Sequence, residues 1–160
     1  MQNEENMIYK FLVFLLLSYS MSAFAESQFD RSLINAAITN EKYEIIDIDG
    51  FNELTRQITN EVAVTLPRKV DIDTELLSMM VSKFLIAQTY ALKGVETKED
   101  LSQKIELKKF NQLIKNYACS SGLGTSLVFR ANGAHFSIKI INSNFIELYS
   151  YTFPLKTCDE

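Results

Sequence analysis

The beginning of the chain limits what the remainder can fold into, because it has the layout of a cleavable export signal. Lys10 precedes an apolar run from Phe11 to Leu17, and the small-residue pattern Ala23-Phe24-Ala25 follows. A positive start, a short apolar run and an A-x-A-like site are the three parts of a secretory signal peptide. We predict cleavage after Ala25. Removing 25 of 160 residues leaves 135, enough for one domain spanning 26–160.

The same segment predicts where the mature protein resides. Its apolar run falls short of the ~20 residues that a membrane span needs, and no cysteine stands near the cleavage site to carry a lipid. We therefore expect a chain without a stable membrane anchor, in the periplasm or secreted. Translation from Met7 would give an ordinary basic start, since Met1 to Asn6 is acidic.

The net charge of the chain limits the kinds of partner that it can bind by electrostatic attraction. The whole chain has a formal net charge of −4 and a pI near 5.1. The signal segment carries Glu4, Glu5 and Lys10, or −1, so −3 remains after cleavage. A net negative charge disfavours nucleic acid and anionic membranes as partners held by bulk charge. We expect a protein partner and no cofactor.

Cys119 and Cys158 are the two cysteines of the sequence, and both lie in the mature chain. An isolated pair in an oxidising compartment usually forms a disulfide. A redox-active pair is the alternative, but such pairs are typically spaced C-x-x-C. We predict a structural disulfide.

Apolar spacing predicts two helices in the first part of the mature chain. The first starts near Phe29 and ends by Asn40, and the second carries Phe51, Leu54, Ile58 and Val62 on one stripe. Between the two helices, the sequence of residues 44–49 favours a short strand or an extended linker. Pro67 ends the second helix, because the residue before proline is pushed out of the helical region.

The pattern then changes to a period of two. Between Thr74 and Lys93 apolar and polar residues alternate, which favours a hairpin with its turn near Ser82-Lys83 over one long helix. The helical spacing of apolar residues from Lys98 to Tyr117 predicts a long helix. Thr97 and Asp100 would form a capping box at its start. Residues 125–130 are compatible with a strand or one helical turn. The alternation of residues within 134–153 predicts a final hairpin.

These elements define the expected architecture. We predict a two-layer α+β sandwich, with an antiparallel sheet of about four strands built from two hairpins and packed against about three helices. One disulfide, between Cys119 and Cys158, would join the helix layer to the sheet layer.

No set of residues converges on a catalytic pattern. His135 is the one histidine, which excludes a two-histidine zinc site, and strand alternation places it on a polar face beside Ser137. The pairs Asp47/Asp49 and Asp71/Asp73 lack the spacing of a calcium loop, so we predict no metal site. Asp71 and Asp73 suit a local turn in which each carboxylate accepts backbone N–H bonds.

The last strand offers a candidate partner surface. Tyr149 and Tyr151 lie on one face of it, and Ile146 and Leu148 on the other. If the aliphatic pair faces the core, the tyrosines form an exposed row suited to docking. If the aromatic residues face the core, the row is packing.

One segment, L-P-x-x-V-D-x-x-T-x-L, resembles a motif of small exported, disulfide-containing proteins of Gram-negative bacteria. Its residues here are Leu66, Pro67, Val70, Asp71, Thr74 and Leu76, and the pattern continues with Tyr90, Cys119, Gly133 and Cys158. The quorum-sensing-regulated virulence-factor-like group is similar at a greater distance. The resemblance implies an α+β sandwich with one disulfide and gives no catalytic residue. Arg68-Lys69 departs from the pattern, which often has an apolar pair there.

The leading hypothesis is a non-catalytic periplasmic or secreted interaction protein, such as an adaptor, inhibitor or immunity-type binder. The lack of a convergent catalytic set and the two tyrosines motivate it. The alternative is a small periplasmic hydrolase that uses His135 as its base.

Overall fold

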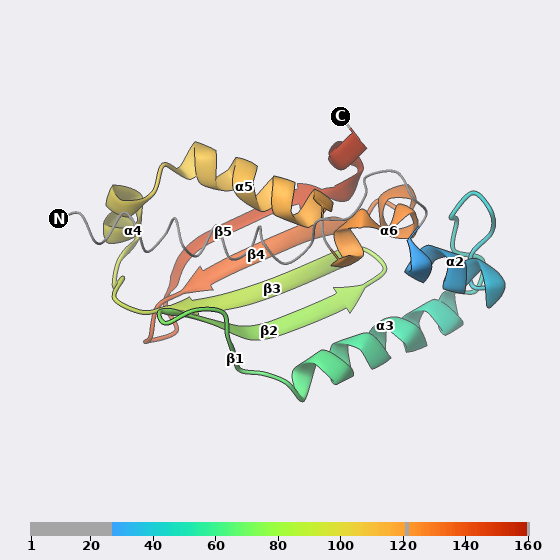
Figure 1. Ribbon diagram of the computed structural model, residues 1–160, viewed down its shortest axis with the longest axis horizontal. Coiled ribbons are helices and arrows are strands. Elements are labelled where there is room, and N and C mark those ends of the chain that lie inside the picture. Colours follow the sequence, from blue (N-terminus) through green and yellow to red (C-terminus); the bar gives the residue numbers. More distant parts are fainter. Residues whose placement is uncertain (1–26, 121, 160) are drawn as a thin grey trace.

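A five-stranded mixed sheet organises the computed structural model, which describes residues 27–120 and 122–159 (Figure 1). The predicted export signal lies outside these residues. The helices are α2 (Gln28–Asn35), α3 (Ile48–Ala63), α4 (Lys98–Lys104), α5 (Leu107–Ser120) and α6 (Leu127–Ala131). The strands are β1 (Arg68–Lys69), β2 (Thr74–Ser82), β3 (Leu85–Leu92), β4 (His135–Ile141) and β5 (Glu147–Pro154). Two short 3-10 helices are η1 (Gly122–Thr125) and η2 (Leu155–Asp159).

The strands lie in the order of the sequence, β1-β2-β3-β4-β5. β1 pairs antiparallel with β2, β2 with β3, and β4 with β5, whereas β3 and β4 run parallel. The α+β class is therefore confirmed, and the expectation of an antiparallel four-strand sheet is wrong in two respects. β1 adds a fifth strand too short to show a sequence pattern, and the two hairpins meet through a parallel pair.

Most local predictions are confirmed. The 74–93 segment forms the β2–β3 hairpin, and β4 and β5 form the final one. The helix with Phe51 on its inner stripe is α3, which begins after Asp47, whose side chain accepts from the Gly50 N–H at 3.0 Å. Residues 127–131 form the helical turn α6 rather than a strand.

The predicted long helix from Lys98 to Tyr117 is two helices. Thr97 and Asp100 form the expected capping box of α4, but Ile105 has an extended backbone (φ −133°, ψ 143°) and separates α4 from α5. The break changes the chain direction, so that α4 contacts β5 while α5 passes over the sheet toward η1 (Figure 1). This division and the short helix α6 raise the helix count from the expected three to five in the part of the chain that the structure describes.

The helices pack on one face of the sheet, and the hydrophobic core lies between them and the strands. The core contains inward side chains of the middle strands, including Ile86, Tyr90, Phe136, Ile138 and Ile140. The other face carries a polar row in register across four strands, formed by Ser78, Thr89, Lys139 and Ser150. A sheet with one buried and one polar face is the expected form for a two-layer fold.

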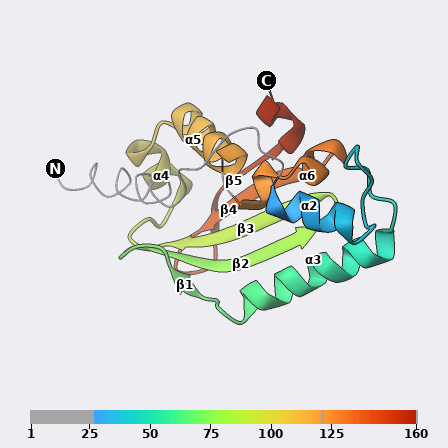
Figure 2. The same ribbon diagram turned by 45° about the vertical axis from the view of Figure 1, so that its right-hand side comes forward.

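Helix α3 runs beside β2 and covers the edge that β1 leaves open (Figures 1 and 2). β1 pairs only with Glu75 and Leu76 of β2. Further along β2, the Val81 N–H donates to the Thr59 hydroxyl of α3 at 3.0 Å, and that hydroxyl donates to the Thr55 carbonyl at 2.9 Å. A helix side chain thus takes the place of a neighbouring strand.

A buried carboxylate joins α2 to α6. Asp30 of α2 is fully buried and accepts hydrogen bonds from the Ser126 hydroxyl and from the backbone N–H groups of Leu127 (3.0 Å) and Val128 (3.4 Å). The first turn of a helix has N–H groups without intrahelical partners, and a carboxylate satisfies them well. Asp30 therefore fixes the amino-terminal helix onto the rest of the fold.

Replacing Asp30 should destabilise the protein strongly. Asp30→Ala leaves the Ser126 hydroxyl and two N–H groups buried without their acceptor, which should lower the free energy of unfolding by about 3 kcal/mol. Urea denaturation followed by circular dichroism measures the change. Asp49→Ala, an exposed acid in the first turn of α3, is the control and should change stability by much less. Equal effects of the two variants would contradict the role given to Asp30.

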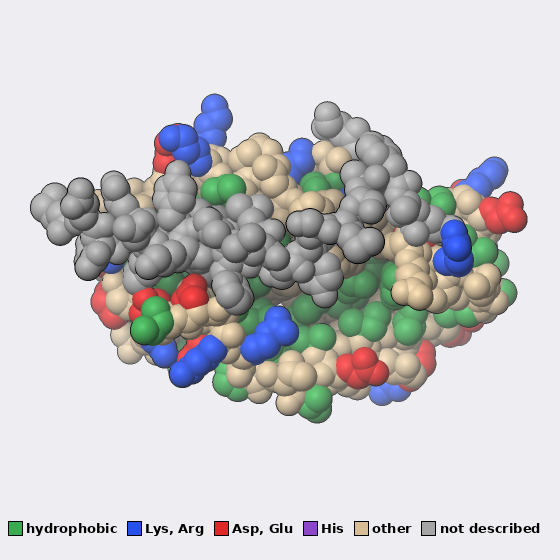
Figure 3. Space-filling model, in the orientation of Figure 1, with side chains coloured by type: hydrophobic (Ala, Val, Ile, Leu, Met, Phe, Trp, Pro, Cys, Tyr) green, Lys and Arg blue, Asp and Glu red, His purple; other side chains and the backbone are tan. Residues whose placement is uncertain are grey.

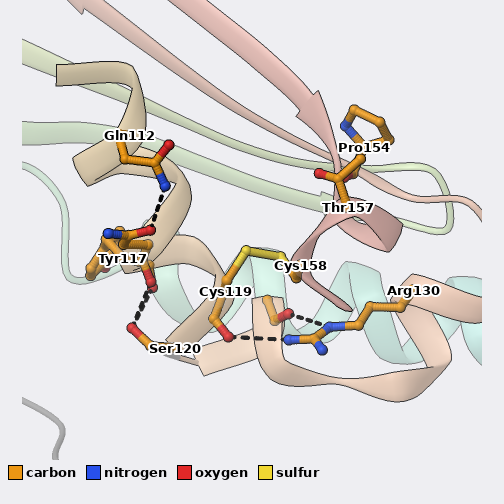
Figure 4. Close-up of a disulfide and its surroundings, with 10 residues drawn as sticks. Gln112, Tyr117, Cys119, Ser120, Arg130, Pro154, Thr157 and Cys158 are labelled. Carbon is orange, nitrogen blue, oxygen red and sulfur yellow. Dashed lines mark hydrogen bonds between the residues drawn. A yellow bond between two sulfur atoms is a disulfide. The ribbon is translucent and has the colours of Figure 1, made fainter. Parts of the chain in front are cut away.

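A disulfide joins Cys119, near the end of α5, to Cys158 in η2. Arg130 reinforces the same junction, because its guanidinium donates to the carbonyls of Cys119 and Gly124, each at 3.1 Å (Figure 4). The disulfide and the arginine together fix the end of α5, η1 and α6 relative to the chain that follows β5.

Removing the disulfide should cost about 4 kcal/mol of stability, because the bond closes a loop with a sequence separation of 39 residues. The variant Cys119→Ala/Cys158→Ala, compared with the oxidised protein by urea denaturation, measures the loss. Thiol titration in denaturant without reductant should find no free thiol in the exported protein. Two titratable thiols would show that the bond does not form there.

Candidate functional site

An open groove of about 780 Å³ lies on the helix-bearing face of the sheet. α3 and the end of α5 with η1 form its two sides, and β2 and β3 form most of its floor (Figures 1 and 2). Figure 3 shows hydrophobic side chains gathered between the sheet and α3, with basic side chains nearer β1. Its volume is in the range of sites that bind other molecules.

The floor is apolar apart from one polar pair. Leu76, Met79, Ile86 and Phe136 provide the apolar part. Between them lie Gln88 and Tyr90, and the Tyr90 hydroxyl donates to the Gln88 side-chain oxygen at 2.9 Å. Burial raises the pKa of Tyr90 above its ordinary value of about 10, so this phenol stays protonated and keeps its role as donor in alkaline solution as well.

The η1 side of the groove depends on a close approach between the backbones of η1 and α5. Gly124 of η1 lies against α5, and a Cβ at this position would be 1.9 Å from the carbonyl oxygen of Ala118. Only glycine allows η1 to pack this closely, and the neighbouring Leu123 then reaches the groove beside Tyr117. The Gly122-Leu123-Gly124 segment is thus a 3-10 turn that shapes the groove.

The segment from Leu66 to Leu76 lies along the β1 end of the groove. Val70, Leu76 and Tyr90 line it directly, and Leu66 packs against the core. Of the turn expected at Asp71 and Asp73, the structure shows the part at Asp71, whose carboxylate accepts from the Asp73 N–H at 2.8 Å. The Val70 N–H donates to the Thr74 carbonyl at 2.9 Å. Gly133, further along, takes a left-handed backbone (φ 73°) between α6 and β4.

Tyr149 and Tyr151 are partly buried and pack against the core. Tyr149 packs edge-on against Phe110 of α5 and donates a hydrogen bond to Asn111, and Tyr151 stacks on Phe153. A bulge in the β4–β5 pairing inserts Leu148 between two paired positions, so Leu148 is buried although Tyr149 also faces the helix layer. The two-residue alternation assumed from the sequence fails at this bulge.

The other candidate residues stay apart. His135 is exposed at the start of β4, and the nearby Ser137 hydroxyl pairs with Thr152 at 2.8 Å. Asp47 caps α3, as described above. Within residues 27–120 and 122–159, no three His, Cys, Asp or Glu side chains are grouped to hold a metal ion. No described helix is long and apolar enough to span a bilayer.

Sequence reasoning missed Gln88 and the groove as a whole. Gln88 was visible as a glutamine between Ile86 and Tyr90 on the inward face of a strand, but no local pattern indicates a gap in the helix layer above it.

The fold and groove place this chain among two-layer α+β proteins with a partly open sheet face, and a solved structure shares the fold. No protein-family model matches the sequence, and neither does any curated protein. A "putative secreted protein" from Pseudomonas aeruginosa aligns with a TM-score of 0.55 at 12% identity, over 71% of this chain and 96% of that one. This likeness shows a common fold.

Two pilotins of type II secretion systems align with lower TM-scores. The Vibrio vulnificus pilotin gives 0.48 at 12% identity, and the Vibrio cholerae pilotin gives 0.47 at 10% identity. Each alignment covers 69% of this chain and 94% of the pilotin.

The protected phenol of Tyr90 predicts a specific pH dependence. Because burial raises the folded-state pKa of Tyr90, the stability it contributes is complete below the ordinary tyrosine pKa of about 10 and is lost as pH rises above it. The difference in unfolding free energy between wild type and Tyr90→Phe should be constant up to pH ~9 and then fall. Urea midpoints of both proteins across this range measure it. A difference that stays constant through pH ~11 would mean that Tyr90 ionises normally in the folded protein.

Proposed function

We propose that this chain is a non-catalytic exported protein that binds a segment of a protein partner in the groove between α3 and η1. The observation that supports this most is the groove itself, a hollow with a mostly apolar lining on the helix-bearing face of the sheet. Apolar surface that remains accessible on the face where the core is formed is typical of a binding site.

Two features support a binding role. The α5–η1 side of the groove is fixed by the disulfide, by Arg130 and by the close approach of Gly124, so this side is formed before a partner arrives. A preformed site loses less conformational entropy on binding than a mobile one. The export signal predicted at residues 1–25 would deliver this site to the periplasm or beyond.

Site-directed photocrosslinking tests the proposal. Benzoylphenylalanine at Val62 or Leu123, both in the groove, should give a discrete crosslinked product with a protein when the full chain is made in its native host. The matched control positions are Thr89 and Ser150, which lie in the polar row of the opposite face. Crosslinks from both faces in equal yield, or from neither, would exclude the groove as the binding site.

A further inference from the structure

Gln88 lies in the floor of the groove, and its side-chain amide has hydrogens that no strong acceptor in the described part of the chain takes up. Its side chain is 91% buried, and its oxygen accepts from the Tyr90 hydroxyl. Its amide nitrogen, which carries two hydrogens, contacts the thioether sulfur of Met79 at 3.9 Å. A thioether is a weak acceptor, so the amide of this groove-lining residue retains donor capacity.

The surroundings of Gln88 make that capacity significant. Its cross-strand neighbours are Met79 on β2 and Ile138 on β4, and Ile86 and Tyr90 flank it along β3 on the same face. Covering this floor with a purely apolar ligand would bury an unsatisfied amide, which is unfavourable. An acyl chain has no acceptor to offer at this depth, whereas a protein segment carries carbonyl oxygens along its whole length.

The charged side chains at the rim of the groove are a second indication of the kind of ligand that it binds. Arg68 and Lys69 of β1 line the groove and are both exposed, and Glu61 of α3 is the one acid among the lining residues. Two cations at one end of an apolar groove favour an acidic ligand and disfavour a basic one.

We infer that the groove binds an acidic, apolar segment of a protein chain, with an oxygen of that segment accepting a hydrogen bond from Gln88 and its acidic side chains facing Arg68 and Lys69. This inference rests on the proposed function and specifies the chemistry of the partner. Gln88 acts as a specificity-determining residue, because it rewards a ligand that brings an acceptor to the centre of the floor.

Two synthetic fluorescein-labelled peptides test the charge preference. Both contain the same short leucine-rich segment, and one ends in two glutamates where the other ends in two lysines. In fluorescence anisotropy at low salt, the glutamate peptide should bind about tenfold more tightly. The double variant Arg68→Glu/Lys69→Glu should reverse this order. Equal affinities, no binding of either peptide, or an order that the double variant leaves unchanged would overturn the inference.

Gln88→Met tests the hydrogen bond. Methionine has a similar shape and is apolar, so the floor stays filled while the donor is lost, together with the acceptor of the Tyr90 hydroxyl. Binding of the glutamate peptide should weaken about tenfold. The control is Gln112→Met, on the exposed side of α5, which should bind normally. Thermal unfolding of both variants checks that the fold is kept. An unchanged affinity in Gln88→Met would overturn the role of Gln88.

Oleate provides the competing occupant. It should fail to displace the glutamate peptide, since its acyl chain leaves Gln88 unsatisfied. Displacement by oleate that is insensitive to Gln88→Met would identify an acyl-chain site and overturn the inference. If photocrosslinks from the groove persist while the two peptides bind equally, the proposed function stands and only the acidic character of the partner is wrong.

Discussion

The parallel pairing of β3 with β4 determines the rest of the architecture. Two parallel neighbours cannot be joined by a hairpin, so the chain must travel back along the whole sheet before it can begin β4. Residues 93–134 make that return as α4, α5, η1 and α6, all on the face that carries the core (Figure 1). The helix layer over β4 and β5 is therefore a direct result of the strand direction. α3, which precedes the sheet, covers the opposite edge, and the groove is the gap between these two parts of the layer.

The local elements were predictable, because their signals lie within a few residues. Alternation identified both hairpins, helical spacing identified α3 and α5, and Thr97 with Asp100 marked the start of α4. The features that failed depend on distant contacts. β1 has two residues and exists because it pairs with β2, and Ile105 ends a helix in the middle of a continuous helical pattern.

The site was predictable only in part. The motif from Leu66 to Leu76 and Tyr90 were selected from the sequence, and Val70, Leu76 and Tyr90 line the groove. Their proximity depends on the β1–β2 pairing and on the β2–β3 register, neither of which has a local signature. Strict alternation left two placements of Tyr149 and Tyr151 open, an exposed row or packing in the core, and the bulge at Leu148 breaks the alternation on which both rest. Asp30 was missed because its role depends on α6, ninety-six residues away at Ser126.

The hydroxyl of Thr59 has a consequence for how the protein can associate with other chains. A strand edge with free backbone groups can recruit a strand of another chain, which is a common route to aggregation. β1 protects only the first part of β2, and the Val81 N–H beyond it is already bonded to Thr59. Strand addition at this position would first require α3 to move away. A single threonine on a helix thus closes this position of the β2 edge to a strand of another chain.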